Sequence, residues 1–247
     1  MIAYGCCAGS SGKFDTGLAP SLREHCPGAP VIVRRDQKSI CDAYNSIMDE
    51  AAALEGLNGL VLVHDDVVFR DAQAEAEIVR ALSGPGVGVV GVVGGRGQRE
   101  LSWWKSTALF GHVEHATHLD DYSRGTAEVD VVDGLLMAVS PWVVHHVRLD
   151  GRGYPAFHGY DGELCRLVKE KGRKVLVADI EIFHDCKPGP WGRPEYGQAL
   201  VEWQRRWGAK SKRDRAVLRA KREVLALAAR HPKLSRLIRA SGPGRHR

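Results

Sequence analysis

The chain has 247 residues, of which 44% are hydrophobic and 26% are charged, as is typical of a globular protein. The N-terminal residues lack the pattern of a signal peptide, and no window approaches about 18 uninterrupted apolar residues, so we expect a cytoplasmic protein without a membrane span. The net charge of +5 is uneven, because fifteen Lys and Arg but only two acidic residues lie in 205–247. We expect an acidic body (1–200), a basic helical extension (201–247) and no specific nucleic-acid partner. Two roles are open for the extension: peripheral association with an anionic surface, or a solvated helix that closes the core.

Strand-like and helix-like segments alternate along the first half of the chain. The apolar runs predict strands at 2–6, 31–35, 57–69 and 86–95, and the helical spacing of apolar residues predicts helices at 21–25, 39–54 and 71–82. This alternation predicts an α/β fold: a Rossmann-like, mainly parallel sheet with helices on both faces. Ligands of such sheets bind at the carboxyl ends of the strands.

The segment 60–69 reads LVLVHDDVVF, so His64, Asp65 and Asp66 interrupt an apolar run. A charge inside a buried strand is costly unless it is paired, bound to a metal or placed at the end of the strand. Hard divalent cations prefer carboxylate oxygens and can be shared with phosphate oxygens. The segment therefore predicts a cation site at a strand end, with a solvated strand end as the alternative.

The segment 94–128 begins with glycines and shows no clear periodicity. A loop of that length in a compact domain is usually functional or disordered, and the pair Trp103 and Trp104 argues against disorder. We expect it to form the wall of a binding cleft, with both indoles against a sugar or an acceptor. The alternative is an irregular hairpin that packs its own small core.

The second half continues the alternation, with a strand or strand pair predicted at 129–144, a turn that leads into a helix within 157–172, and a strand run at 174–186. Asp161 stands at the start of that helix, where it could be a simple N-cap, and the helix terminus is expected to keep its pKa low. His184 ends a strand run and could equally be a structural histidine. The six cysteines show no zinc-binding spacing, and we expect reduced thiols.

The order of several motifs along the chain is more specific than any one of them. They are AYNSIMDEA, HDDV, GVVGVVGG followed by WW, VDGLLMAV, HGYDGELCRLVKEKG and a late strand that ends in a histidine. Together they resemble the inverting family-2 glycosyltransferases of the GT-A fold, and most closely the branch of streptomycin-biosynthesis-type proteins. The resemblance covers roughly residues 30–186.

The resemblance implies a metal-dependent inverting glycosyltransferase with a catalytic domain at 1–200. It implies a nucleoside diphosphate sugar as donor, expected to be a UDP-sugar, a Mn²⁺ or Mg²⁺ cofactor and an acceptor of open identity. The roles that it implies are metal binding by Asp66 and His184, general-base catalysis by Asp161, and donor or acceptor binding by Asp36, Asp65, Gly134, Trp103 and Trp104. Tyr160 replaces the glutamate that usually precedes the base.

Two other functions remain open at this point. The set His64, Asp66 and His184 also fits the triad of two histidines and one carboxylate found in non-haem Fe(II) oxygenases, although those triads usually occur on all-β scaffolds. The replacement at Tyr160 and the absence of a VDDGS motif after the strand at 31–35 also fit a nucleotide-binding module without catalysis.

Overall fold

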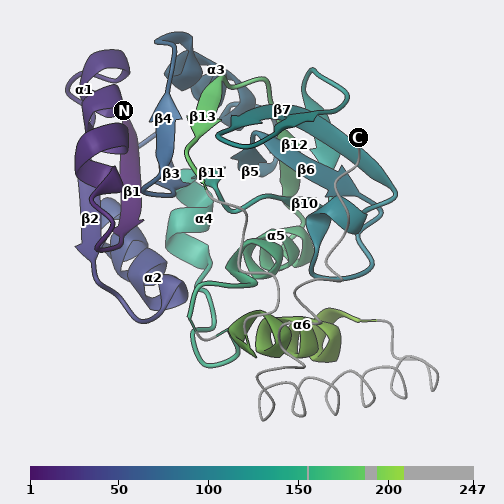
Figure 1. Ribbon diagram of the computed structural model, residues 1–247. Helices are drawn as coiled ribbons and strands as arrows, with labels where there is room; N and C mark the ends of the chain where they lie inside the picture. The colour runs from purple at the N-terminus through teal and green to yellow at the C-terminus, as the bar shows by residue number, and fades with distance from the viewer. Residues whose placement is uncertain (155, 187–193, 209–247) are drawn as a thin grey trace.

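The computed structural model describes residues 1–154, 156–186 and 194–208 (Figure 1). Strands and helices alternate through the first part of the chain. In order they are β1 (Ile2–Ala8), α1 (Ala19–His25), β2 (Val31–Arg35), α2 (Ile40–Ala51), β3 (Gly59–Val63), β4 (Val67–Phe69), α3 (Gln73–Leu82), β5 (Val87–Gly91) and β6 (Val93–Arg96). The remaining elements are β7 (Ala108–His115), β8 (Leu119–Asp121), β9 (Ala127–Val129), β10 (Val131–Val132), β11 (Leu136–Val139), α4 (Pro141–His146), α5 (Tyr160–Glu170), β12 (Lys174–Val177), β13 (Ile182–His184) and α6 (Pro194–Trp207).

The larger sheet has seven strands in the order β2-β1-β3-β11-β5-β12-β9. Within the described ranges, β1 pairs in parallel with β2 and β3, and β5 pairs in parallel with β12. The other three pairings, which involve β11 and β9, are antiparallel. The sheet is therefore mixed, and the expectation of a mainly parallel sheet is corrected at β11 and β9.

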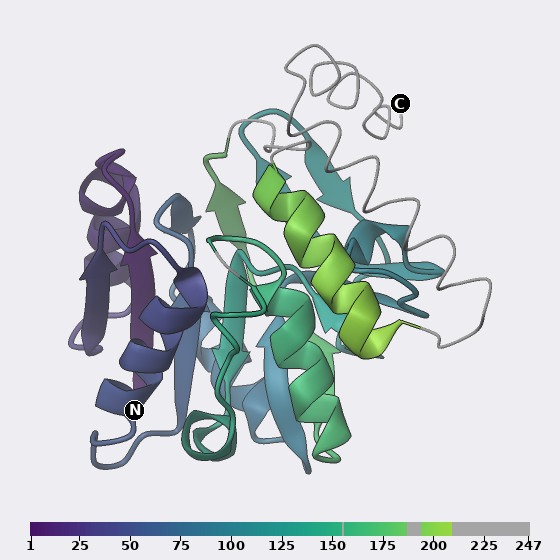
Figure 2. The ribbon, with the colours of Figure 1, turned by 90° about the horizontal axis from the view of Figure 1, so that it is seen from below.

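Helices cover both faces of this sheet. A Cβ on Gly5 of β1 would meet Ile47 of α2, and a Cβ on Gly88 of β5 would meet Val168 of α5, so these helices share one face. Figure 2 shows α2 and α5 together, viewed from that side. The Tyr4 hydroxyl points to the opposite face, where it contacts the end of α1 and the first turn of α3.

The second sheet has the order β10-β6-β7-β13-β4, with β8 paired to β7. Three of the predicted strands are therefore divided between the sheets, and one of them, the run 86–95, divides into β5 of the larger sheet and β6 of the second. The run 57–69 breaks at His64–Asp66, where the chain leaves β3 and enters β4, and the run 174–186 divides into β12 and β13. Apolar patterning predicts extended structure, but it does not report that the chain passes from one sheet to another.

The segment 94–128 contains most of the second sheet, and the expectation of a long irregular loop is wrong for much of it. β7 pairs with both β6 and β8, and Val113 is fully buried between polar neighbours. The hairpin alternative describes β7 and β8 correctly. Glycines 94 and 95 sit where Val131 and Ser106 leave no room for a Cβ, so close packing accounts for the glycine-rich start.

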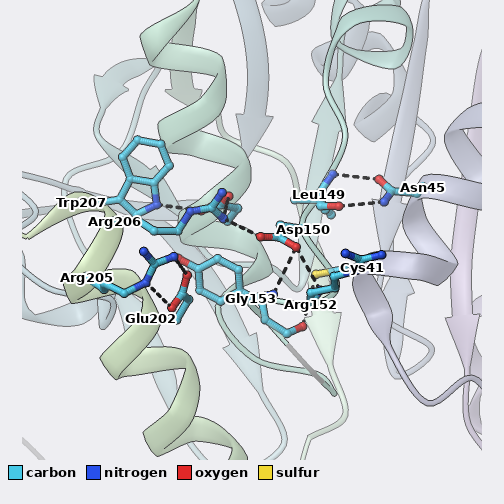
Figure 3. Close-up of polar contacts among 12 residues, drawn as sticks. Cys41, Asn45, Leu149, Asp150, Arg152, Gly153, Glu202, Arg205, Arg206 and Trp207 are labelled. Atoms are coloured by element: carbon cyan, nitrogen blue, oxygen red, sulfur yellow. Dashed lines mark hydrogen bonds and ion pairs between the residues drawn. The ribbon is translucent and has the colours of Figure 1, made fainter.

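Helix α6 packs on α5 through buried polar contacts. Glu163 of α5 is fully buried and accepts hydrogen bonds from the Arg206 guanidinium (2.5 Å) and the Trp207 indole (2.7 Å). Arg206 also lies 3.3 Å from Asp150 (Figure 3). The boundary expected at residue 200 falls inside α6, and the basic extension from residue 209 lies outside the described residues. In the described part of the chain, no helix is long and apolar enough to cross a bilayer.

Candidate active site

The ends of three neighbouring parallel strands bring the first group of polar residues together. Gly9 follows β1, Asp36 follows β2 and His64–Asp66 follow β3. Asp65 Oδ2 accepts a hydrogen bond of 2.9 Å from the Gly9 N–H, which fixes the two loops against each other. Asp36 is exposed and has a positive φ of 52°, and its N–H donates to the Ala8 carbonyl. The predicted donor-binding residues Asp36 and Asp65 thus lie at the same edge of the sheet.

Asp66 and His184 are adjacent because β13 pairs with β4, with His184 opposite Val67. His184 Nε2 lies 3.1 Å from Asp66 Oδ1, and the Asp185 N–H donates to the Asp66 carbonyl at 2.8 Å. Although burial alone would raise the pKa of Asp66, the hydrogen bond with His184 and the nearby positive charges lower it. Asp66 is therefore ionised at neutral pH.

Lys13 approaches the same carboxylate from the loop after β1. Its ammonium donates to the Asp185 carbonyl and lies 3.7 Å from Asp66 Oδ2. Sequence reasoning missed this residue, since a single lysine in a Gly/Ser loop has no periodic signal. The structure gives Asp66 two cationic or proton-bearing neighbours, Lys13 and His184.

His64 lies between Asp66 and Tyr160. Its Nδ1 lies 4.0 Å from Asp66 Oδ1, and its Nε2 lies 2.5 Å from the Tyr160 hydroxyl. Burial lowers the pKa of His64, which favours the neutral imidazole that can bind a metal ion. His64, Asp66 and His184 offer three ligand atoms within 4.8 Å of one another.

Asp161 lies in the first turn of α5, next to Tyr160. Burial, followed by the charge of Asp133, raises the pKa of Asp161 to about 7, although backbone N–H groups that include those of Gly162 and Gly134 act against the shift. The expectation that the helix terminus keeps this pKa low is therefore wrong. Desolvation and a like charge outweigh the favourable dipole, which contributes only about 1 kcal/mol near a helix end.

Gly134 makes room for the tyrosine that replaces the usual glutamate. A Cβ at this position would stand 2.2 Å from the Tyr160 hydroxyl oxygen, so the ring reaches His64 only because residue 134 has no side chain. The Tyr160 ring also packs edge-on against Tyr44 of α2, with 5.6 Å between centroids. Tyr160 thereby connects Asp161 to the histidine beside Asp66.

The two tryptophans differ in their surroundings. Trp103 is only 5% exposed, and its indole N–H donates to Asp133 Oδ2 at 2.7 Å. Its ring packs edge-on against Trp104 and Tyr122. The ring face of Trp103 thus belongs to the core, which corrects the expectation that it lies open toward a sugar, whereas Trp104 is half-buried.

A second cluster of metal-binding side chains adjoins the first. His115 of β7 lies opposite His184 in the parallel pairing of β7 with β13, and their Nδ1 atoms are 3.1 Å apart. Cys186 Sγ lies 3.6 Å from His115 Nδ1. Although burial would raise it, hydrogen bonds with His115 and His184 lower the pKa of the Cys186 thiol to about 7. Sequence reasoning assigned no chemistry to any cysteine, because only the pairing of distant strands brings this one to two histidines.

Known proteins resemble this chain in sequence. A family model described as a glycosyltransferase-like family matches residues 28–193. The streptomycin biosynthesis protein StrF of Streptomyces griseus is 32% identical over 209 residues, which cover 83% of this chain and 74% of that protein.

Solved structures share the fold at low sequence identity. GalNAc-T7 with UDP, GalNAc and Mn²⁺ superimposes with a TM-score of 0.60 and 11% identity, over 91% of this chain but only 51% of that chain. The mannosyltransferase PcManGT of Pyrobaculum calidifontis, in complex with GDP-Man and Mn²⁺, superimposes with a TM-score of 0.54 and 12% identity, over 98% of this chain and 76% of that chain. The strand-end carboxylates, the family match and these GT-A neighbours lead to one conclusion: the chain belongs to the glycosyltransferase-like family and adopts the GT-A fold.

Proposed function

We propose that this protein transfers a sugar from a nucleoside diphosphate sugar to an acceptor nucleophile, with inversion at the anomeric carbon and dependence on a divalent cation. The observation that carries the proposal is the contrast between two carboxylates, Asp66 and Asp161, whose surroundings shift their pKa values in opposite directions. Pairs of this kind commonly divide electrostatic and proton-transfer roles.

Asp66 and His184 would hold the cation, with His64 as a third ligand. The donor set of one carboxylate oxygen and two imidazole nitrogens within 4.8 Å fits a divalent ion. It suits Mn²⁺ better than Mg²⁺, because Mg²⁺ is usually bound through oxygen ligands alone. When bound, the cation neutralises charge on the departing diphosphate, which is worth several kcal/mol. Both solved structures that share the fold, GalNAc-T7 and PcManGT, contain Mn²⁺, which supports this assignment.

Asp161 would accept the proton of the acceptor as it attacks. A general base works best when its pKa lies near the operating pH, and a pKa of about 7 meets that condition. Attack from the side opposite the diphosphate inverts the anomeric centre in a single step. Asp65 and Asp36 would contact the ribose and the base, since both lie at the strand ends that carry Asp66.

The donor is expected to be a UDP-sugar, although the two neighbours are complexed with UDP and with GDP-Man. The basic extension is proposed to contact an anionic acceptor or membrane surface. Removing the residues from Lys210 onward should weaken binding to anionic vesicles in a salt-sensitive way and spare donor binding. Unchanged vesicle binding by the truncated protein would argue against this role.

The full chain should be screened against nucleoside diphosphate sugars by thermal shift, with and without Mn²⁺, and product nucleotide should be quantified. A donor at about 100 times its Kd adds about 2.7 kcal/mol to the free energy of unfolding. We expect Mn²⁺-dependent stabilisation and release of nucleoside diphosphate. Binding without turnover in the presence of acceptors would indicate a nucleotide-binding module.

One observation favours the alternative function of an Fe(II) oxygenase: the ligand atoms of His64, Asp66 and His184 lie close together. The family and the fold place those residues in a glycosyltransferase, so we assign them to the cation of the donor site. Incubation with Fe(II) and a 2-oxoacid is the control. Oxidation of the oxoacid without nucleotide-sugar turnover would reverse the assignment.

A further inference from the structure

His115, His184 and Cys186 come together through strand register and not through sequence spacing. In the second sheet β13 pairs with β7, which sets His184 beside His115. Cys186 follows His184 by two residues, and a hydrogen bond of 2.8 Å from its N–H to the His184 carbonyl folds the chain back. All three side chains are buried or half-buried, with the His115 side chain 7% and the His184 side chain 11% exposed.

The separations of their ligand atoms match those of a tetrahedral metal site. With Zn–N bonds of about 2.0–2.1 Å and a Zn–S bond of about 2.3 Å, tetrahedral angles place two nitrogens roughly 3.3–3.4 Å apart and a nitrogen roughly 3.6 Å from the sulfur. The structure has 3.1 Å between the two Nδ1 atoms and 3.6 Å between His115 Nδ1 and Cys186 Sγ. Little rearrangement is needed for all three atoms to face one ion.

The far nitrogen of each histidine ring faces a carboxylate. His115 Nε2 lies 3.2 Å from Asp120 Oδ2, and Asp120 is held in turn by the Tyr122 hydroxyl. His184 Nε2 lies 3.1 Å from Asp66 Oδ1. Histidines that bind a metal usually donate their other N–H to a carboxylate or carbonyl, which fixes the ring and its tautomer. The arrangement therefore orients both Nδ1 atoms toward Cys186.

We propose that His115, His184 and Cys186 bind a transition-metal ion of the Zn²⁺ class, at a site that differs from the proposed donor cation site by its thiolate and shares His184 with it. His184 faces this site with Nδ1 and Asp66 with Nε2, so the two sites use His184 alternately. Two imidazoles and a thiolate select Zn²⁺ over Mg²⁺, which prefers oxygen. With three protein ligands, the fourth position of the tetrahedron is open to water or an exogenous ligand. This inference goes beyond the proposed transfer reaction, and its test does not depend on that reaction.

A neighbouring set competes for His115. His118 stacks on His115, with 4.2 Å between centroids, and its Nε2 lies 4.0 Å from Asp120 Oδ1. His115, His118 and Asp120 could also hold an ion. That set contains no sulfur, and the His118 side chain is 53% exposed. The presence of a metal–thiolate bond therefore distinguishes the two sites.

Co²⁺ binding to the metal-free full chain, in excess Mg²⁺, tests the proposal by absorption spectroscopy. We expect the d–d bands of tetrahedral Co²⁺ together with a thiolate-to-metal charge-transfer band, and displacement of both by one equivalent of Zn²⁺. Cys186→Ser should abolish the charge-transfer band. It should also weaken Zn²⁺ binding by more than the ~10- to 100-fold that loss of an outer-shell partner costs.

Cys7→Ser is the matched control, because Cys7 is another half-buried free thiol, on β1. It should leave the spectrum unchanged, as should His118→Ala. A wild-type spectrum without the charge-transfer band, or a band that survives in Cys186→Ser, would overturn the proposal. If Cys186→Ser does not fold, alkylation of the wild-type chain decides the question: Zn²⁺ but not Mg²⁺ should slow modification of Cys186, and equal rates would overturn the site.

Discussion

The two carboxylates at the centre of this protein occupy opposite electrostatic environments. Asp66 lies between β3 and β4, where burial would raise its pKa but the hydrogen bond with His184 and the charge of Lys13 lower it. Asp161 lies on α5, where burial and the charge of Asp133 raise its pKa to about 7. The strand-end carboxylate therefore keeps its charge at every physiological pH, whereas the helix carboxylate exchanges its proton near neutrality. The hydrogen bond between His64 and Tyr160 connects the two regions.

Asp66→Ala is expected to have the largest effect on activity, because it removes the carboxylate that stays ionised at physiological pH. The diphosphate would then face a site without a carboxylate to hold its cation, and several kcal/mol of stabilisation would be lost. We expect Mn²⁺-dependent donor binding to disappear and transfer to fall by roughly 10³-fold or more. Calorimetry of donor binding with and without Mn²⁺ measures the first effect. Asp121→Asn on β8 is the control, and retained Mn²⁺ dependence in Asp66→Ala would remove Asp66 from the cation site.

Asp161→Asn tests the other half of the comparison. The amide keeps the size of the carboxylate and one oxygen that can accept from the Gly162 N–H, but it cannot take a proton from the acceptor. Donor affinity should therefore persist while single-turnover transfer falls by roughly 10²- to 10⁴-fold. Normal transfer in this variant would exclude Asp161 as the base.

The same substitution changes stability in a direction that the raised pKa fixes. A carboxyl whose pKa is higher in the folded state than in the unfolded state destabilises the fold once the pH exceeds the unfolded value. Asp161→Asn should thus raise the melting temperature at pH 8, and the gain should vanish near pH 4. Thermal unfolding at the two pH values measures it. An equal gain at both would mean that the Asp161 charge is not the cause.

Much of the strand-end region could be predicted from the sequence. An apolar run that stops at His64–Asp66 indicates a strand end, and parallel strands bring such ends to one edge. The α5 helix and its end before Gly172 also follow from local pattern, since Gly172 adopts a φ of 74° after the last turn. These features depend on residues close together in the chain.

The remaining features depend on contacts between distant segments. The neighbours of Asp66 and His115 are set by the register of β13 against β4 and β7, which no periodicity encodes. The sequence predicts the wrong direction for the shift in the Asp161 pKa, because it shows the helix terminus but neither the burial of the carboxyl nor the approach of Asp133. The packing of α6 through Glu163 and Arg206 could not be predicted either, because a glutamate in an amphipathic helix is normally expected to lie on the surface.

Asp133→Asn should reduce the difference between the two carboxylates by lowering the pKa of Asp161 toward that of Asp66. Asp133 raises the pKa of Asp161 through its charge, so its neutralisation should shift the acidic limb of the kcat/KM profile to lower pH. Burial is the larger cause and remains, so we expect a shift of about one pH unit at most. The rate at pH 8 should hardly change, because Asp161 is already ionised there. An acidic limb that does not move would indicate that another group controls it.

Tyr160→Phe should have the smallest effect and tests the connection between the two regions. It removes the hydroxyl that meets His64 Nε2 and leaves that nitrogen without this partner. A single buried hydrogen bond contributes about 1 kcal/mol, so we expect Mn²⁺-dependent donor affinity to fall by less than about tenfold, with a melting temperature a few degrees lower. Tyr44→Phe is the matched control, because the Tyr44 ring packs against Tyr160 but its buried hydroxyl has no hydrogen-bond partner among the described residues. If both variants bind Mn²⁺ and donor equally well, the orientation of His64 does not depend on Tyr160, and the strand-end and helix carboxylates act independently.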